Sequence, residues 1–491
     1  MEEVLFWCLA EQINLSVSGH PASVGKFRKE SMTTTASTPM KRSGYPTEPE
    51  FHVFDVEGHK HLLESNTLKT WIVKNPEETE AIKNAFGKIT KPIFNAYPAP
   101  QFQAVCFQMT RACNLACSYC FVRNYYDPKT DVLSLDTVKR FAEKYMSKEN
   151  VSVSFFGGEP TLCMDRVEEI RAYCVSRCPK THFSITTNGT LLDRPACGYP
   201  SVAEYLGRNG FSGIISIDGP PEVHDTYRKF ATGDGSASTI LRNLEAFKST
   251  SGYIKRVTLR GTFTSEIIHS AVSLKDRLQY LNELMYSGIG QHVSIEPVVL
   301  SETSCISGDK ELTMMDQEDV LLALEQQYMD AVKWFAGEVN KGRKPKWHQI
   351  LKMLERLYFQ TPAFQECGAG KGYCSLDVDG SICACHRLQF TKIGHVDIGM
   401  DEALRAKWLE SRGYVRKGCN ECPVRYVCGS GCKEASLLYY KDLYKPVEIE
   451  CKLRMIWIKC AFYLMANCNV ADILQRPKNN GTPGKTVSAG K

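Results

Sequence analysis

The most regular pattern along the chain is an alternation of short apolar runs and amphipathic stretches between about residues 105 and 299. The apolar runs have the length and composition of buried strands and lie at 105–109, 151–156, 182–186, 213–217, 256–263 and 292–296. The stretches between them have apolar residues at helical spacing, at 134–145, 165–178, 201–208, 238–248 and 270–285. Alternating strands and helices form parallel βαβ units. The sequence therefore predicts an α/β fold with six such units, as a partial (β/α)6 barrel or an open sheet, with reactive groups on loops at the carboxyl ends of the strands.

The flanking segments have different patterns. Residues 12–49 are rich in Ser, Thr, Pro and Gly without periodicity, which is typical of disorder. A hairpin is expected over 51–63, a helix over 77–86, and two long helices at about 316–340 and 347–359. After Cys367 the pattern is irregular and Cys-dense, which suggests folding around metal rather than around a large apolar core. The predicted parts are a disordered extension (1–49), a small N-terminal module (50–98), the α/β unit (99–310), a helical connection (311–366), a Cys-rich region (367–470) and a disordered tail (471–491).

Composition narrows the functional classes. The chain has 491 residues, of which 43% are hydrophobic and 23% charged, as in ordinary globular proteins. A net charge of +5 is small for this length, so we expect no nucleic-acid partner. The mean hydropathy is −0.27, and no apolar run approaches the ~18 residues of a membrane span, so we expect no membrane partner.

The unusual number is 21 cysteines. The share is too low for a small disulfide scaffold, and the N-terminus lacks the positively charged region of a secretory signal. We therefore expect reduced thiols in a cytoplasmic protein, and many reduced thiols in one chain suggest metal.

Three of these thiols follow the first predicted strand. Cys113, Cys117 and Cys120 have C-x3-C-x2-C spacing on one loop. Three local thiols can hold three corners of a four-iron cluster and leave one iron open. Zinc would need a fourth Cys or His nearby. Cys106 lies within the strand and no His follows nearby, so zinc lacks its fourth ligand. The alternative to a metal site is that the three cysteines are a chance run of core residues.

Together with the following Phe121, these cysteines closely resemble the signature of radical S-adenosylmethionine (SAM) enzymes. The resemblance implies that SAM chelates the open iron through its amino and carboxylate groups. It also implies that reduction of the cluster releases a 5′-deoxyadenosyl radical, which abstracts hydrogen.

Further motifs occupy the expected places along the barrel. Gly157-Gly158-Glu159 ends the second strand and resembles the family motif that binds the methionine amino group of SAM. Glycines allow the backbone to approach a ligand closely, and a carboxylate can accept hydrogen bonds from an ammonium group. The resemblance implies that Asn188 and Ser216, at the ends of the third and fourth strands, help to hold the ribose and carboxylate. Arg228 is a candidate for the carboxylate because a guanidinium binds it bidentately. A turn or capping role is the alternative for each.

The remaining cysteine motifs lie near the C-terminus. This part of the chain resembles the SPASM extension of radical SAM enzymes. The resemblance lies in Cys367-x12-Gly380-x4-Cys385, in the C-x2-C-x5-C-x3-C run from Cys419 to Cys432, and in the later Cys451. With Cys374 as an eighth thiol, for which Cys383 is the alternative, the resemblance implies two auxiliary four-iron clusters and three clusters in all. The inner cluster would be held by Cys367, Cys374, Cys385 and Cys432, and the outer one by Cys419, Cys422, Cys428 and Cys451. A pair of zinc ribbons is the alternative. A turn at Asp379-Gly380 is expected to bring Cys374 and Cys385 together.

The resemblance also bears on the substrate. In anaerobic sulfatase-maturating enzymes an Asp base follows the cysteine matched by Cys385, whereas this chain has His386-Arg387. The chain is more similar to maturases that form thioether or carbon–carbon cross-links in ribosomally made precursor peptides. That similarity implies a precursor peptide and a flavodoxin- or ferredoxin-type electron donor as partners. A sulfatase-type or other side-chain maturase and a non-catalytic zinc-binding module are the alternatives.

The N-terminal module has two interpretations. It could bind a leader peptide by strand addition, or it could cap the barrel.

Overall fold

The computed structural model describes residues 48–87, 101–121, 132–248, 256–298, 318–387, 391–413 and 415–474. The predicted disordered extension, apart from its last two residues, and the tail after residue 474 lie outside the described residues.

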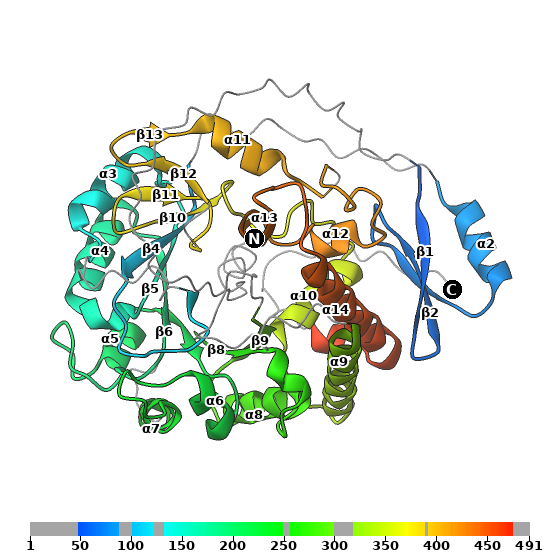
Figure 1. The fold of residues 1–491 in the computed structure, drawn as a ribbon, viewed down its shortest axis with the longest axis horizontal. Helices are drawn as coiled ribbons and strands as arrows, with labels where there is room; N and C mark the ends of the chain where they lie inside the picture. Colours follow the sequence, from blue (N-terminus) through cyan, green and yellow to red (C-terminus); the bar gives the residue numbers. More distant parts are fainter. Residues whose placement is uncertain are drawn as a thin grey trace, which may run out of the picture.

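Six parallel strands form the centre of the molecule, in the order of the chain. Each coincides with a predicted strand to within a residue or two: β4 (Ala104–Thr110), β5 (Ser152–Gly157), β6 (His182–Thr187), β7 (Ser212–Ser216), β8 (Arg256–Phe263) and β9 (His292–Pro297). Figure 1 shows the strands curving around a common interior with helices outside. Every residue of β4 is buried, as expected for a parallel strand covered on both faces. The predicted α/β partial barrel is confirmed.

Some of the helices that cover the barrel begin at local capping signals. Ser134 caps the first of them through the Thr137 N–H, and Ser273 forms a capping box with Asp276. The sequence analysis missed α6, a helix of seven residues that begins after Pro220. The covering helices are α3 (Leu135–Tyr145), α4 (Met164–Arg177), α5 (Val202–Arg208), α6 (Pro221–Tyr227), α7 (Ala237–Lys248) and α8 (Leu274–Tyr286).

The Cys-rich region continues the barrel sheet. Strand β10 (Tyr373–Leu376) pairs in parallel with β4, and β11 (Ser381–Cys383) returns antiparallel to β10. Two further strands, β12 (Lys392–His395) and β13 (Gly399–Met400), complete a ten-stranded sheet. The predicted turn is present, and Gly380 has a φ of +84° that favours glycine.

The prediction that this region has no large apolar core is wrong. Helix α14 (Glu448–Asn467) is buried along most of its length and packs against α9 (Glu318–Asn340) and α10 (His348–Tyr358). The sequence of α14 shows no 3.6-residue period of apolar residues, because the helix is apolar around much of its circumference rather than along one face. The remaining C-terminal helices are α11 (Glu402–Glu410), α12 (Arg425–Cys428), α13 (Lys433–Tyr440) and α15 (Val470–Ile473), the last of which lies within the predicted tail.

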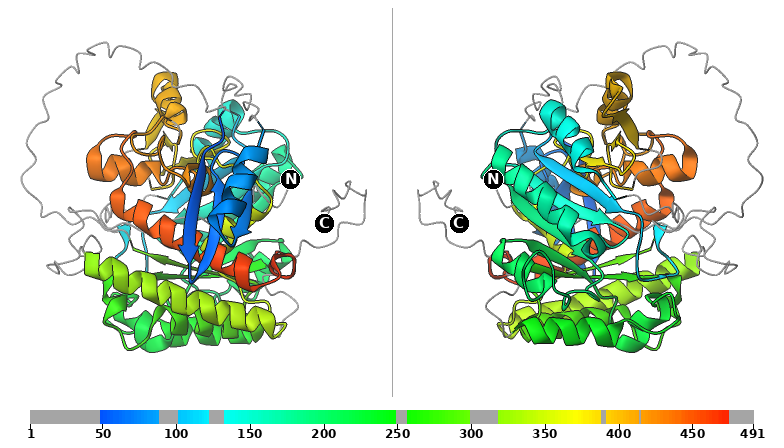
Figure 2. Two further views of the ribbon diagram at one scale, coloured as in Figure 1. Left: turned by 90° about the vertical axis from the view of Figure 1, so that its right-hand side faces the viewer. Right: turned by 90° about the vertical axis from the view of Figure 1, so that its left-hand side faces the viewer.

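The N-terminal module contains the predicted hairpin, β1 (Phe51–Val56) and β2 (His59–Glu64), and helix α2 (Pro76–Ala85). A third strand that the sequence analysis missed, β3 (Thr70–Val73), pairs with β2. Figure 2 shows this sheet lying against α14, and the rings of Phe54 and His61 contact Phe462 of that helix. The described residues of the module therefore pack on the C-terminal helices.

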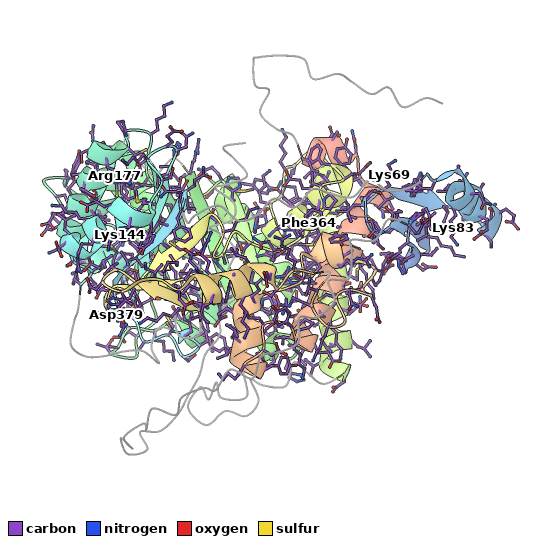
Figure 3. All side chains as sticks on the ribbon, turned by 90° about the horizontal axis from the view of Figure 1, so that it is seen from above. Lys69, Lys83, Lys144, Arg177, Phe364 and Asp379 are labelled. Atoms are coloured by element: carbon purple, nitrogen blue, oxygen red, sulfur yellow. The ribbon has the colours of Figure 1, made fainter. Side chains whose placement is uncertain are left out.

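Figure 3 shows the length of the molecule. Lys69 and Lys83 mark the module at one end, and Lys144 and Arg177 mark α3 and α4 at the other. Among the described residues, no helix is both long enough and apolar enough to cross a membrane.

Candidate active site

The three cysteines of the first motif lie together on the loop after β4. Burial, with smaller contributions from other thiols of the loop, raises the pKa of Cys113 to about 12 and that of Cys117 to about 11. The loop is held in place by hydrogen bonds from Ala116 N–H to the Lys229 carbonyl (2.7 Å) and from Ser118 N–H to the Tyr227 carbonyl (3.0 Å). Buried thiols become thiolates only beside a cation, so this donor set fits an iron–sulfur cluster.

The two glycines of the second motif lie directly against the start of that loop. A Cβ at Gly158 would overlap the Ala112 carbonyl, and a Cβ at Gly157 would overlap that of Thr110. Gly158 N–H donates to the Thr110 carbonyl at 2.7 Å. Only glycine allows this approach, so the motif and the cysteine loop form one wall of the site.

The carboxylate of Glu159 also has a structural role. Its buried carboxylate accepts hydrogen bonds from the Thr161 N–H and hydroxyl (3.0 and 2.6 Å), the Thr187 hydroxyl (2.7 Å) and the Asn188 N–H (2.7 Å). Three of these donors bond to Oε1 and one to Oε2, so Oε2 keeps a lone pair that could accept from an ammonium. Glu159 thus also holds the ends of β5 and β6 together.

Asn188 reaches the cysteine loop, as its place after β6 suggested. Its amide nitrogen lies 3.8 Å from the Cys113 sulfur and donates to Asn114 at 2.9 Å. Its oxygen accepts from the Thr190 N–H and hydroxyl. Asn188 therefore lies at the edge of the predicted cofactor site.

A buried polar group surrounds Arg228. Its guanidinium donates to the Tyr119 hydroxyl at 2.8 Å, and that hydroxyl donates to Asp218. Its charge lowers the pKa of Cys117 against the larger effect of burial. The Arg228 Nε is buried and has no hydrogen-bond partner among the described residues, so it has a donor left for a carboxylate. The sequence analysis missed Asp218 and the hydroxyl of Tyr119, because nothing in the spacing shows that they meet.

Ser216 ends β7 in register with Arg260 of β8, and its side chain is half-buried. Arg260 forms an ion pair with Glu296 of β9 at 2.9 Å. The sequence analysis also missed this pair.

Three of the four thiols predicted for the inner set, Cys367, Cys385 and Cys432, lie near one another. Burial raises the pKa of Cys385 well above its usual value, and Cys432 and Cys367 raise it further. The predicted fourth member is elsewhere. Apart from burial, the thiols that raise the pKa of Cys374 are Cys383 and Cys106.

Strand geometry explains the position of Cys374. The adjacent Tyr373 bonds to His386 next to Cys385, and successive side chains of a strand point to opposite faces. Cys374 is fully buried within the apolar core, so the expectation that the hairpin unites it with Cys385 does not hold.

The four thiols predicted for the outer set influence one another electrostatically. Burial raises the pKa of Cys451, and Cys428, Cys419 and Cys422 raise it further. All four thiols therefore lie close together, between the loop before α12 and the first turn of α14.

His386 and Arg387 lie between the two halves of the site. The His386 Nδ1 is 2.9 Å from the Tyr373 hydroxyl, and burial holds the pKa of His386 well below its usual value, so the ring is neutral. The ring packs against Phe156, and Arg387 lies 5.1 Å from the centre of the Phe121 ring. Because Phe121 follows Cys120, the radical loop and the inner thiols share one interior.

Comparison with known proteins agrees with this geometry. Residues 107–263 match the model of the radical SAM superfamily. A cysteine-type anaerobic sulfatase-maturating enzyme from Clostridium perfringens is 31% identical over 363 residues, which cover 68% of this chain and 91% of that protein. An AdoMet-dependent heme synthase from Nitratidesulfovibrio vulgaris is 23% identical over 356 residues, covering 68% and 88%.

The fold is also found among solved structures. Native anSMEcpe with bound AdoMet and the Kp18Cys peptide superposes with a TM-score of 0.58 at 18% identity, covering 74% of this chain and 98% of that chain.

The partial barrel with three cysteines on the loop after its first strand defines a class of SAM-cleaving enzymes. This chain belongs to the radical SAM superfamily, and within it the sulfatase-maturating enzymes are close relatives. Membership implies SAM and one four-iron cluster as cofactors. It also counts against a non-catalytic zinc-binding module.

Proposed function

We propose that the protein is a radical SAM peptide maturase that cross-links two residues of a ribosomally made precursor peptide. The observation that carries this proposal is the interior shared by the radical loop and the inner thiols, joined through Phe121, Phe156 and Arg387. A peptide bound there would contact both. With SAM, a radical cluster and two auxiliary clusters of the SPASM type bound, the cofactors supply a radical for hydrogen abstraction and a route for the released electron.

The chain's own residues hold and orient the reactants. Cys113, Cys117 and Cys120 would bind the radical cluster, and the glycine turn packs directly against their loop and so fixes its position. Arg228 provides a buried donor for the SAM carboxylate. The aromatic rings around Arg387 exclude water from the interior, which protects a carbon radical.

The residue after Cys385 separates this proposal from sulfatase maturation. A buried, neutral His386 with a strongly lowered pKa is a weak proton acceptor at neutral pH. In cross-linking, the proton can leave as the new bond forms, so the reaction depends less on a strong base. Sulfatase maturation depends more on one, because its substrate must first be ionised.

We also propose that the N-terminal module binds the leader of the precursor peptide. Within the described residues, β3 pairs with β2 alone and lies at the edge of the three-stranded sheet. An extended peptide could add there as a fourth strand.

The test is turnover with peptides under anaerobic reduction by a flavodoxin or ferredoxin. We expect release of 5′-deoxyadenosine and a product that has lost two hydrogens, with a cross-link in tandem mass spectrometry. The control is the Cys113→Ala, Cys117→Ala, Cys120→Ala variant, which should release none. Absence of 5′-deoxyadenosine from the reduced wild-type protein would refute the catalytic assignment.

A second candidate is a sulfatase-type side-chain maturase. The identity of 31% to the Clostridium perfringens enzyme over most of that protein's length supports it. Oxidation of a single residue without a cross-link, in the same experiment, would favour this candidate.

A further inference from the structure

Two charged side chains beside the inner thiols have buried polar atoms without a hydrogen-bond partner among the described residues. Both Nη atoms of Arg387 and the Oε2 atom of Glu434 are buried without a hydrogen-bond partner among the described residues. Their closest approach is 3.9 Å, an ion-pair distance too long for a hydrogen bond. The exposed fractions of the side chains are 3% and 6%. Buried charges of this kind need a further partner of opposite charge.

The inner set of thiols lacks its predicted fourth member and could therefore take another ligand. Three of them, Cys367, Cys385 and Cys432, are gathered, whereas Cys374 faces the apolar core on the other side of β10. A four-iron cluster held by three thiols has one iron without a protein ligand.

Glu434 is placed to reach that iron. It lies two residues after Cys432, in the first turn of α13. Its charge contributes to the raised pKa of both Cys385 and Cys432, so it is close to two members of the set.

The neighbouring acid is already occupied. The Glu450 carboxylate accepts from the Cys432 N–H at 2.9 Å and from the Arg454 guanidinium at 2.9 Å. Glu450 therefore positions the loop of Cys432, and Glu434 is the acid with an unused oxygen.

We propose that the Glu434 carboxylate is the fourth protein ligand of the inner auxiliary cluster, in place of Cys374. Arg387 then donates its unpaired N–H groups to the same cluster. The iron satisfies the orphaned oxygen, and the cluster's negative charge satisfies the guanidinium. This inference rests on the auxiliary clusters of the proposed function but not on the identity of the substrate.

The experiment uses the full chain with Cys113→Ala, Cys117→Ala and Cys120→Ala, so that auxiliary clusters alone are observed. After anaerobic reconstitution this parent should hold about eight irons, that is, two four-iron clusters. Iron content, electron paramagnetic resonance of the reduced clusters and reduction potential are measured in the parent and in Glu434→Ala, Glu434→Cys and Cys374→Ala.

We expect Glu434→Ala to lose up to half of the iron or to change the signal of one cluster. Glu434→Cys should retain the iron with a lower potential for that cluster, because thiolate donates more electron density than carboxylate. Cys374→Ala is the matched control and should leave iron content and both signals unchanged. Retention of the Glu434→Cys clusters also shows that the position tolerates change without unfolding.

Loss of iron or a changed signal in Cys374→Ala would overturn the proposal. So would an unchanged spectrum in Glu434→Ala, or a spectrum of the parent that shifts with added cyanide, which would reveal an open iron. A parent without iron would overturn the auxiliary clusters themselves, whereas the other contrary results overturn only the ligand.

Discussion

At Gly158 the backbone of the glycine turn lies so close to Ala112 that it has no space for a Cβ. The next residue, Glu159, accepts hydrogen bonds from residues of two neighbouring loops and so holds them together. Single residues of the site thus act largely by placing backbone and by filling hydrogen-bond positions. Their substitution should affect cofactor binding more than folding.

Gly158→Ala should weaken SAM binding about tenfold or more, because overpacking a close contact costs about 1–3 kcal/mol and must move the cysteine loop. Equilibrium binding of SAM to the reconstituted protein measures this. Gly337→Ala on α9 is the control, since no atom lies within 4 Å of the added Cβ. Equal affinities in the two variants would contradict the steric argument.

His224 should make the stability depend on pH. Burial holds its pKa at about 3, and the neutral ring accepts from the Asp218 N–H and bonds to Ser236. In the unfolded chain His224 titrates near pH 6.5. The contribution of the neutral, buried His224 to the free energy of unfolding is therefore complete above that pH and is lost as the pH falls towards 3. Between pH 7.5 and 5.5 the loss is about 1.4 kcal/mol.

Urea unfolding of His224→Gln should therefore show a smaller decline over that range than the wild-type protein. Parallel declines would mean that His224 does not carry the effect.

At the scale of elements, one buried acid joins the parts that carry the C-terminal thiols. Glu366, next to Cys367, pairs with Arg356 of α10 at 2.9 Å and Arg454 of α14 at 2.6 Å. Those two arginines hold the pKa of Glu366 well below its usual range against the effect of burial. Arg356 also donates to the Val427 carbonyl at 2.6 Å. The helices thus position the loops of both thiol sets.

Glu366→Gln should destabilise the protein by about 3–5 kcal/mol, because it removes the counter-charge of buried Arg356 and one of the two acids that pair with Arg454. Denaturant unfolding measures the change. Glu80→Gln removes an exposed pair with Lys83 and should change stability by less than about 1 kcal/mol. A similar, small effect of both substitutions would show that the buried network is not coupled to folding.

At the scale of the molecule, the N-terminal module is attached far from the barrel interior. Phe462 contacts it through Phe54 and His61, and Arg425, beside the outer thiols, pairs with Glu50 at 2.8 Å. A leader peptide bound at the edge of this module would therefore be held beside the outer thiols while its core reaches the barrel.

Phe462→Ala should cost about 3–5 kcal/mol and loosen the module first. Hydrogen exchange should become faster in β1–β3 and stay unchanged in β4–β9. Leu322→Ala on α9 is the control, because Leu322 is 63% exposed. Uniformly faster exchange would show that the module and the barrel unfold as one unit.

Much of the barrel and of its radical site could be predicted, because the signals are local. The six strands follow from short apolar runs, and the spacing of Cys113, Cys117 and Cys120 lies within one loop. Helix α14 could not be predicted from period, since burial on all sides removes the polar face that would reveal it.

The sequence by itself determined the βα order and the loop with the three-cysteine motif, because each depends on neighbours along the chain. Only the tertiary structure decided that β10 extends the barrel sheet, that Cys374 faces away from Cys385, and that Arg387 meets Glu434. These features depend on contacts between distant residues, such as Gln108 with His386, 278 positions apart, and Ser65 with Pro423, 358 positions apart. No local pattern encodes such contacts, since they form only when whole elements pack.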